Sequence, residues 1–294
     1  MLLVTGVNGG LGSLVLERLA GSSAGGAVGP DGAVAGVVAG SRDPERVPAL
    51  GVPVRTVDFD RPETLAEAFT GVRTLLLISA GYGEDDVVIA RHRAAIEAAE
   101  RAGVEHVVYT SLAGDGDHLA YALAHRWTER RLRASETLRW TILRNGLYAE
   151  LLGALAAPDA DGVITAPFGD GRLAAVARED LAEVAVTVAL APAGHAGRVY
   201  ELVGEEAVGG ADVAAELSRA GGRPVEYRPG TLAEVRAVAA ASGAEAFQVP
   251  MMAGTYSAVA HGFLEGPGGP GDLAELLGRR PRPALEVIAA AAAR

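Results

Sequence analysis

The sequence predicts an α/β protein with a doubly wound parallel sheet, followed by a smaller α/β region in the C-terminal half. Three observations lead to this prediction. Short apolar runs alternate with helical segments along residues 1–148, a glycine-rich turn follows the first run, and the pattern becomes less regular after residue 148. The chain of 294 residues can bury a sizeable core, since 49% of its residues are apolar.

The first strand, turn and helix carry a sign of a ligand site. Residues 1–5 form a short apolar run that predicts a buried strand, and Gly6, Gly9 and Gly12 follow at three-residue spacing. The apolar residues that come next recur at helical spacing: Leu11, Leu14, Val15 and Leu19. Glycines let a pyrophosphate approach the backbone, and the first N–H groups of a helix point at it. We therefore expect a dinucleotide site; the alternative is an ordinary turn between strand and helix.

The end of the second predicted strand, residues 34–39, indicates which dinucleotide binds. In this type of fold the strand tip lies beside the adenosine ribose, and an acidic residue there selects NAD. Ser41 and Arg42 occupy the tip in this chain. A hydroxyl and a guanidinium suit a 2′-phosphate, so we expect NADP(H); the alternative is that Arg42 is a solvated loop charge. Residues 21–32, before this strand, are expected to form a flexible surface insertion.

The third predicted strand, residues 52–57, precedes three residues that can serve the adenine or the next helix. The Asp58 carboxylate can accept a hydrogen bond from the adenine amino group, and the Phe59 ring can flank the base. We assign Asp60 to the N-cap of a helix expected over 62–69.

The later strand–helix units place further residues at strand ends. The expected strands are 74–79, 104–110 and 139–143, and the expected helices are 85–102 and 118–135. Ser79, Ala80 and Gly81 follow one of these strands at its carboxyl end, where ligands gather in parallel sheets. His92 lies on the first of these helices, and we interpret it as a structural residue.

The C-terminal half is expected to form a small α/β cap over the carboxyl edge of the sheet, with a substrate cleft between them. Its expected strands are 162–167, 198–203 and 225–228, and its expected helices are 175–190, 210–220, 231–242, 272–278 and 283–293. Residues 243–271 are glycine-rich, and no regular element is predicted in them. We divide the chain into region 1–150, which binds the dinucleotide, and a smaller substrate-binding region, 151–294, interleaved with the first.

The composition argues against several other functions. The net charge of −11 and the lack of a basic block argue against a nucleic-acid partner. No apolar run is long enough to span a membrane, and the N-terminus lacks the basic region of a signal peptide, so a cytoplasmic protein is expected. The chain has no cysteine, and its 6 histidines lack metal-binding spacing, so we predict neither thiol chemistry nor a metal site.

A series of short motifs resembles the NmrA-like group of atypical short-chain dehydrogenases. The motifs are TGVNGGLG, SRDP, DFD, LLLIS, YTSL, H-x-x-T-E-x-x-L, LRNGLY, FGDGRLAAVAREDLA and GRVYELVGEE, and they extend over residues 1–240. Within this group the chain looks most like the bacterial NADPH:quinone oxidoreductases of type 2. The resemblance implies a Rossmann domain that binds NADPH, a small substrate domain, and a quinone or another electron-poor acceptor.

The resemblance also implies which residues contact the cofactor. The phosphate loop of the group falls on Gly6, Asn8, Gly9, Gly10 and Leu11. Its 2′-phosphate arginine falls on Arg42, and its adenine residues fall on Asp58 and Phe59. Its strand ends beside the nicotinamide fall on Ser79, Ala80, Thr110 and Asn145.

The group lacks the Tyr-x-x-x-Lys pair of ordinary short-chain dehydrogenases, and His125 and Glu129 stand at those places in this chain. His125 can hydrogen-bond the substrate or the cofactor and donate a proton near neutral pH; the alternative is a structural residue anchored by Glu129 one helical turn away. Tyr148 is expected either to close the cleft or to be a buried aromatic with a satisfied hydroxyl. Tyr121, on the same helix face as His125, is a further candidate acid.

The expected function is hydride transfer from NADPH to a quinone or a similar electron-poor acceptor. Two alternatives are a regulator that senses NADP(H) without turnover, and a secondary-metabolism reductase that acts on a ketone, enone or imine with His125 as the acid. The expected partner is a small-molecule acceptor, with neither nucleic acid nor membrane, and a homodimer is left open.

Overall fold

The computed structural model describes residues 1–21, 36–80, 82–114, 118–269 and 271–293. Apart from its first residue, the insertion expected over 21–32 lies outside the described residues. The start of the strand expected from residue 34 and Gly81 lie outside them as well. In the described part of the chain, no helix is both long and apolar enough to cross a membrane.

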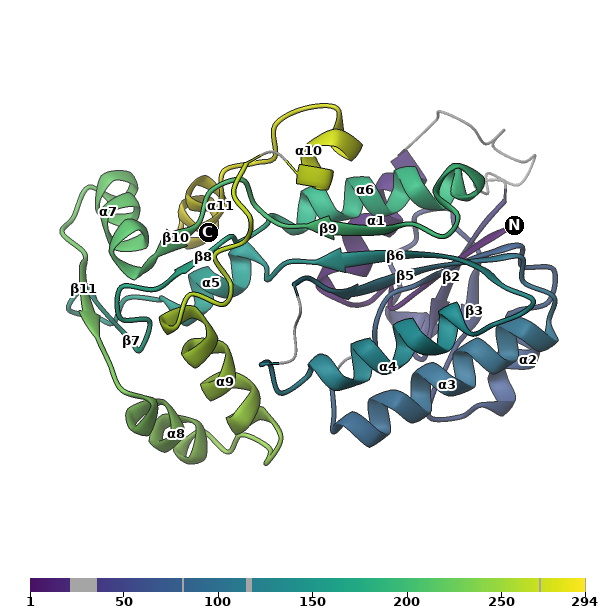
Figure 1. Ribbon diagram of the computed structural model, residues 1–294, viewed down its shortest axis with the longest axis horizontal. Coiled ribbons are helices and arrows are strands. Elements are labelled where there is room, and N and C mark those ends of the chain that lie inside the picture. The colour runs from purple at the N-terminus through teal and green to yellow at the C-terminus, as the bar shows by residue number, and fades with distance from the viewer. Residues whose placement is uncertain (22–35, 81, 115–117, 270, 294) are drawn as a thin grey trace. The chain divides into compact units, whose positions relative to one another are not determined.

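The central element is a seven-stranded parallel sheet with strand order β3-β2-β1-β4-β5-β6-β9 (Figure 1). Its strands are β1 (Leu2–Thr5), β2 (Val37–Ser41), β3 (Val54–Thr56), β4 (Thr74–Leu77), β5 (His106–Leu112), β6 (Arg139–Asn145) and β9 (Val199–Leu202). The strand order runs outward in both directions from β1 and β4, which is the doubly wound arrangement that alternating strands and helices predict. The predicted fold class is therefore confirmed.

The strand register brings the carboxyl ends of the strands to one edge of the sheet. Leu2 of β1 lies opposite Val37 of β2 and Thr74 of β4, and Thr74 lies opposite His106 of β5. Every residue of β1, β2 and β5 is buried, as expected for parallel strands that are covered on both faces. Ligand-binding residues can then gather only in the turns that follow the strands.

Helices cover both faces of this sheet. Figure 1 shows α1 and α6 on one face and α3 and α4 on the other. The bounds are α1 (Gly10–Gly21), α2 (Glu63–Ala68), α3 (Asp85–Arg101), α4 (Ala122–Arg133) and α6 (Arg178–Leu190), with 3-10 turns at Pro44–Arg46 and Pro192–His195. Val88, His92, Ala95, Ile96 and Ala99 form the buried stripe of α3 at helical spacing. This stripe packs into a core that contains Leu3, Phe69, Leu75 and Tyr109.

The rest of the chain forms smaller elements around a second core. Two short sheets pair β7 (Val163–Ala166) with β11 (Glu226–Pro229) in parallel and β8 (Arg172–Leu173) with β10 (Val208–Gly209) antiparallel. The helices are α5 (Ala149–Leu155), α7 (Gly210–Gly221), α8 (Leu232–Ala241), α9 (Gln248–Ala260), α10 (Gly271–Leu277) and α11 (Ala284–Ala292). Phe168, Tyr256 and Ile288 contribute to this core.

Helix α9 lies within residues 243–271, for which the sequence pattern predicted no element. The buried residues of α9 include Ala253, Thr255 and Ala258, which are small or polar and give a weak apolar pattern. The helix is stabilised by tertiary contacts, because the Tyr256 hydroxyl donates to the Leu155 carbonyl at 3.0 Å and α9 packs against α8. Packing of this kind leaves little trace in local sequence periodicity.

The chain divides into two compact units, each assembled from several segments. The first unit comprises residues 1–111, 124–144 and 181–200, and the second unit comprises 112–123, 145–180 and 201–294. The chain passes repeatedly between these units, and the predicted division into 1–150 and an interleaved region 151–294 stays a prediction. Asn145 and the segment that follows β6 belong to the second unit, whereas most of α6 belongs to the first.

Candidate functional site

The glycine turn between β1 and α1 exposes backbone amides at the start of a helix. Gly6 has φ +69°, in the left-handed region that favours glycine, and its carbonyl accepts the Gly9 N–H at 3.0 Å. A Cβ on Gly12 would lie 2.1 Å from the Gly6 carbonyl oxygen, so only glycine lets the helix approach the turn this closely. Asn8 and Gly10 are exposed, and α1 begins at Gly10. The turn therefore fits the diphosphate of a dinucleotide.

The loop after β2 adjoins the glycine turn. The Asn8 side-chain amide approaches the Asp43 carbonyl at 3.5 Å, which connects the two loops. Ser41 is buried, and its hydroxyl accepts the Asp43 N–H at 3.0 Å. The Leu11 side chain is buried as well, so Leu11 can offer a ligand only its backbone amide.

Arg42 is exposed at the tip of β2, and its guanidinium makes no hydrogen bond or ion pair with the described residues. Nearby, the Asp60 carboxylate pairs with Arg91 at 2.6 and 2.8 Å. The hydrogen bonds from Arg91 hold the pKa of Asp60 below its ordinary value, and the positive charge of Arg42 lowers it further. The Asp60 carboxylate is thus occupied by Arg91, and the Arg42 guanidinium stays available for a 2′-phosphate.

The assignment of Asp60 as a helix N-cap was wrong. Helix α2 begins at Glu63 with Pro62 at its N-cap, and the Asp60 carboxylate binds Arg91 instead. No local pattern could have predicted this ion pair, because its two residues lie 31 positions apart.

Asp58 and Phe59 follow β3, where the adenine residues are expected. The Asp58 Oδ1 accepts the Asp60 N–H at 3.0 Å, and within the described residues its Oδ2 makes no hydrogen bond. Phe59 is half-buried against the core of the first unit. A free carboxylate oxygen and a partly exposed ring are compatible with adenine contacts, and both assignments stay predictions.

Ser79, Ala80 and Thr110 come together at the carboxyl ends of β4 and β5. The Ser79 N–H donates to the Thr110 hydroxyl oxygen at 2.9 Å, and the Ala80 N–H donates to Nε2 of His92 at 3.0 Å. Because Nε2 accepts, the neutral His92 carries its proton on Nδ1, which lies 2.8 Å from the Thr128 hydroxyl. Burial lowers the pKa of His92 to about 3, so this residue is a fixed, neutral support for the strand end.

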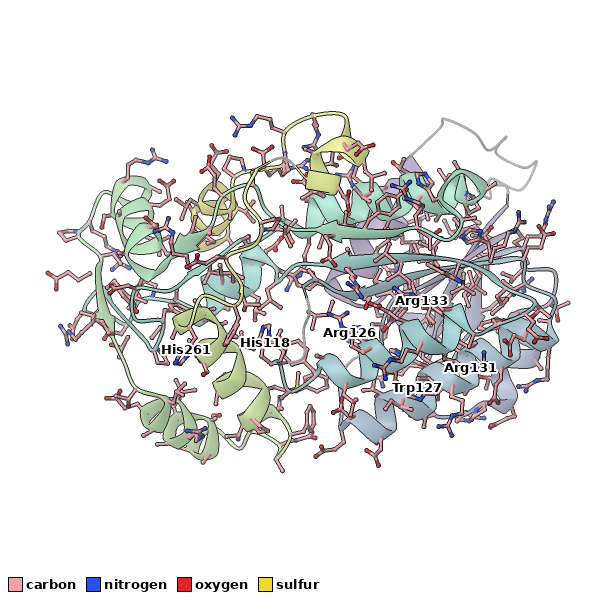
Figure 2. All side chains as sticks on the ribbon, viewed as in Figure 1. His118, Arg126, Trp127, Arg131, Arg133 and His261 are labelled. Atoms are coloured by element: carbon pink, nitrogen blue, oxygen red, sulfur yellow. The ribbon has the colours of Figure 1, made fainter. Side chains whose placement is uncertain are left out.

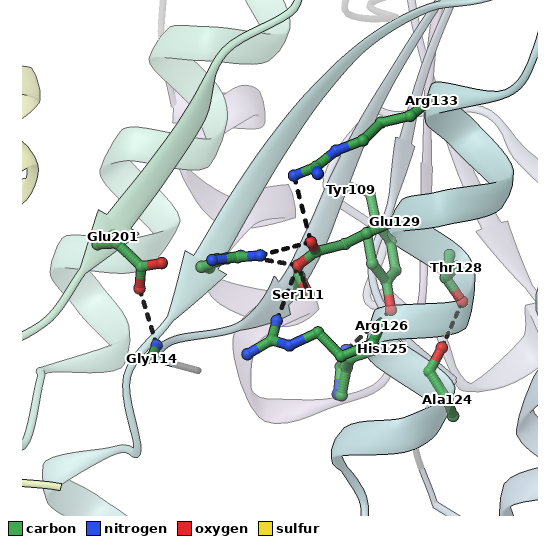
Figure 3. A network of polar contacts seen from close by, with 11 residues as sticks. Tyr109, Ser111, Gly114, Ala124, His125, Arg126, Thr128, Glu129, Arg133 and Glu201 are labelled. Carbon is green, nitrogen blue, oxygen red and sulfur yellow. Dashed lines mark hydrogen bonds and ion pairs between the residues drawn. The ribbon is translucent and has the colours of Figure 1, made fainter. Parts of the chain in front are cut away.

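Tyr109 and His125 form a buried pair, shown in Figure 3. The Tyr109 hydroxyl oxygen lies 2.8 Å from Nδ1 of His125. Burial raises the pKa of Tyr109 and lowers the pKa of His125 to about 4, so both side chains are neutral at pH 7. The Nε2 of His125 has no hydrogen-bond partner among the residues that the structure describes. His125 can therefore offer this nitrogen to a ligand as a neutral group, and its role as a proton donor stays a prediction.

The structural alternative predicted that Glu129 anchors His125, but Glu129 makes its hydrogen bonds to other residues. Its carboxylate accepts hydrogen bonds from Ser111 at 2.7 Å, Arg126 at 2.9 Å and Arg144 at 2.7 Å, and it lies 3.4 Å from Arg133 (Figure 3). Burial would raise the pKa of Glu129, but the hydrogen bonds from Arg144 and Ser111 outweigh this effect and lower it. Glu129 is therefore an ionised, fully occupied carboxylate.

Asn145 and Tyr148 lie close together in the second unit. The Arg178 guanidinium lies 4.7 Å from the centre of the Tyr148 ring. Burial raises the pKa of Tyr148. The Asn145 Oδ1 is buried and has no hydrogen-bond partner in the described structure. A buried oxygen of this kind can accept a hydrogen bond from a ligand N–H or O–H group.

Tyr121 does not share a helix face with His125, so that prediction was wrong. Helix α4 begins at Ala122, one residue after Tyr121, and Tyr121 belongs to the second unit. Its hydroxyl lies 3.3 Å from the Thr255 hydroxyl, and burial raises the pKa of Tyr121.

The sequence interpretation missed two residues that organise the first unit. Tyr109 contacts His125 across 16 positions, and Arg91 contacts Asp60 across 31. Tyr109 directly follows two valines in β5, and a tyrosine at the end of such an apolar run was a usable signal. The sequence offered no comparable signal for Arg91.

The chain belongs to the NAD(P)H-binding family, whose model matches residues 6–192. Quinone oxidoreductase 2 of Escherichia coli (strain K12) is 36% identical over 230 residues, which cover 78% of this chain and 77% of the relative. The predicted resemblance to NmrA-like proteins and type-2 quinone oxidoreductases is confirmed. The protein is thus an NAD(P)H-dependent oxidoreductase.

Two solved structures resemble the whole chain. The Citrobacter sp. triphenylmethane reductase complexed with NADP(H) aligns with a TM-score of 0.85 and 31% identity over 99% of both chains. The NADPH complex of the Escherichia coli NADPH-dependent quinone oxidoreductase QOR2 aligns with a TM-score of 0.84 and 32% identity, again over 99% of both chains.

Proposed function

We propose that the protein transfers a hydride from NADPH to a quinone or a similar electron-poor acceptor. The observation that carries this proposal is the pair of residues at the places of the short-chain dehydrogenase Tyr and Lys. His125 is neutral there, and Glu129 is occupied by Ser111 and arginines. Neither residue can supply the strong acid that an alkoxide product requires, whereas a reduced quinone is a weakly basic phenolate that water can protonate.

Residues of the first unit are proposed to hold NADPH. The exposed amides after Gly6 bind the diphosphate, Arg42 and Ser41 bind the 2′-phosphate, and the Asp58 carboxylate accepts the adenine amino group. NADPH supplies the hydride when it is bound, and with one proton the acceptor becomes a hydroquinone. The names of the relatives support an acceptor with a conjugated ring, since one acts on quinones and another on triphenylmethane dyes.

Two polar side chains are proposed to orient the reacting groups. The free Nε2 of His125 can hydrogen-bond the acceptor or the cofactor, and the buried Oδ1 of Asn145 can accept a hydrogen bond from a cofactor N–H group. Positioning of this kind accounts for much of the rate when the acceptor is intrinsically reactive. The predicted cytoplasmic location and the homodimer stay predictions.

Oxidation of NADPH by a panel of acceptors tests the proposal. We expect turnover with 1,4-benzoquinone and 1,4-naphthoquinone, and at least about 100-fold lower kcat/KM with cyclohexanone, because a missing general acid costs about two orders of magnitude or more. Comparable turnover of cyclohexanone would contradict the proposal and favour a ketone reductase. Tight binding of NADPH without turnover of any acceptor would favour a sensor.

A further inference from the structure

Backbone hydrogen bonds fix the position of Phe263, but its side chain is exposed. It is 60% exposed, although it follows α9 in a tight helix cap. The Phe263 N–H donates to the Ala258 carbonyl and the Gly262 N–H donates to the Val259 carbonyl, both at 3.0 Å, with Gly262 at φ +75°. This pair of hydrogen bonds defines the Schellman motif, in which a hydrophobic residue at the position of Phe263 usually packs back on the helix.

Phe263 instead stacks with two imidazole rings. Its ring centre lies 4.7 Å from that of His118, with 24° between the ring planes, and 6.5 Å from that of His261, with 30° between the planes. Both histidines are exposed; His118 lies in the segment before α4 and His261 follows α9, and both are labelled in Figure 2. Nδ1 of His261 donates to the Ser257 carbonyl at 2.7 Å, which fixes that ring. We call His118, His261 and Phe263 the ring stack.

The segment that carries Phe263 is also fixed to the body of the second unit. The Leu264 carbonyl accepts the Ala174 N–H at 2.9 Å. Gly266 has φ +72°, and a Cβ there would lie 2.9 Å from the Ala174 Cβ, so the backbone passes directly over this residue. Phe263 is therefore exposed on a segment whose backbone is fixed in place.

The ring stack is connected to candidate residues of the same unit through the chain segment that carries His118. The segment of His118 continues to Tyr121, whose hydroxyl lies 3.3 Å from Thr255 on α9. Tyr121 and Tyr148 are near enough to interact electrostatically, and the side chain of Asn145 acts on the pKa of Tyr148. Within the second unit, aromatic side chains thus connect Asn145 with the segment of the ring stack.

We propose that the ring stack binds planar, electron-poor acceptors by stacking and selects fused-ring over single-ring quinones; this rests on the proposed function. Aromatic faces carry partial negative charge, so they attract the electron-poor ring of a quinone in an offset stack. Because stacking energy grows with the area of overlap, a fused ring gains more from the ring stack than a single ring. Phe263 is thereby a specificity-determining residue.

Two substitutions of Phe263 separate stacking from a structural role. Phe263→Leu removes the ring but keeps an apolar side chain, and Phe263→Tyr keeps the ring. Val238→Ala is a matched control, because Val238 is 69% exposed on α8 of the same unit. The measurements are KM for 1,4-naphthoquinone, 1,4-benzoquinone and NADPH, and the Kd of 1,4-naphthoquinone for the enzyme–NADP⁺ complex, in which no turnover occurs.

Phe263→Leu should raise KM and Kd for 1,4-naphthoquinone about tenfold, with a smaller change for 1,4-benzoquinone and less than about a twofold change in KM for NADPH. Phe263→Tyr and Val238→Ala should resemble the wild type. An unchanged Kd of 1,4-naphthoquinone in Phe263→Leu would overturn the proposal that the ring stack binds the acceptor. If the Tm of this variant is also lowered, Phe263 has a structural role. If no quinone is turned over, the proposed function fails. The Kd values of 1,4-naphthoquinone still show whether the ring stack binds a planar ring.

Discussion

His92, His106 and His125 show how burial determines the protonation of single residues. Burial lowers the pKa of His92 to about 3 and the pKa values of His106 and His125 to about 4. Each ring keeps at least one fixed hydrogen bond; for example, Nε2 of His106 donates to the Thr141 hydroxyl, whose own proton goes to the His195 carbonyl. All three histidines stay neutral at pH values where an unfolded chain binds protons.

The free energy of unfolding should therefore fall when the pH falls from 7.5 to 5.5. Below about 6.5 the unfolded histidines become protonated, whereas the folded ones do not until about pH 4 or lower, so protons favour the unfolded state throughout this window. We expect a loss on the order of 1 kcal/mol per histidine, measured by urea unfolding at both pH values. His106→Gln should reduce the difference, and equal stability at both pH values would show that these residues are not held neutral.

Among the elements, those set by local sequence were predictable, and those set by tertiary packing were not. The apolar run of β1 and the glycine spacing before α1 lie within twelve residues, and the structure has the expected strand, turn and helix there. Helix α9 was missed because its buried face is made of small residues such as Ala253 and Ala258. Long-range contacts of side chains, such as that between Tyr109 and His125, were missed for the same reason: no local pattern encodes them.

Gly12→Ala tests the glycine turn between β1 and α1, which is proposed to bind the diphosphate of NADPH. The added Cβ would lie 2.1 Å from the Gly6 carbonyl oxygen, a backbone atom that cannot move cheaply. We expect a loss of about 1–3 kcal/mol in the free energy of unfolding by urea, together with weaker NADPH binding by fluorescence titration. Gly21→Ala on the same helix is the control, since a Cβ there would meet no atom within 4 Å. Equal behaviour of the two variants would contradict the role of Gly12.

At the scale of the molecule, the two compact units carry different parts of the proposed chemistry. The first unit holds the glycine turn, Arg42 and the buried His125, and the second unit holds Asn145 and the ring stack. Each unit draws on segments from both halves of the chain, because β6 passes from the first unit into the second and most of α6 returns to the first. Sequence periodicity locates the strands and helices one after another, but it does not show which of them pack into the same unit.

The central claim is that the first unit binds NADPH and recognises its 2′-phosphate through Arg42. The most direct measurement is the Kd of NADPH and of NADH for the wild type, for Arg42→Ala and for Arg46→Ala, whose arginine is exposed in the same loop. We expect the wild type to prefer NADPH. Arg42→Ala should raise the Kd of NADPH about 10- to 100-fold, as for a lost charge-assisted hydrogen bond, and leave the Kd of NADH within about twofold. Arg46→Ala should change neither. Equal changes for both nucleotides in Arg42→Ala, or a wild type that binds neither of them, would contradict the account.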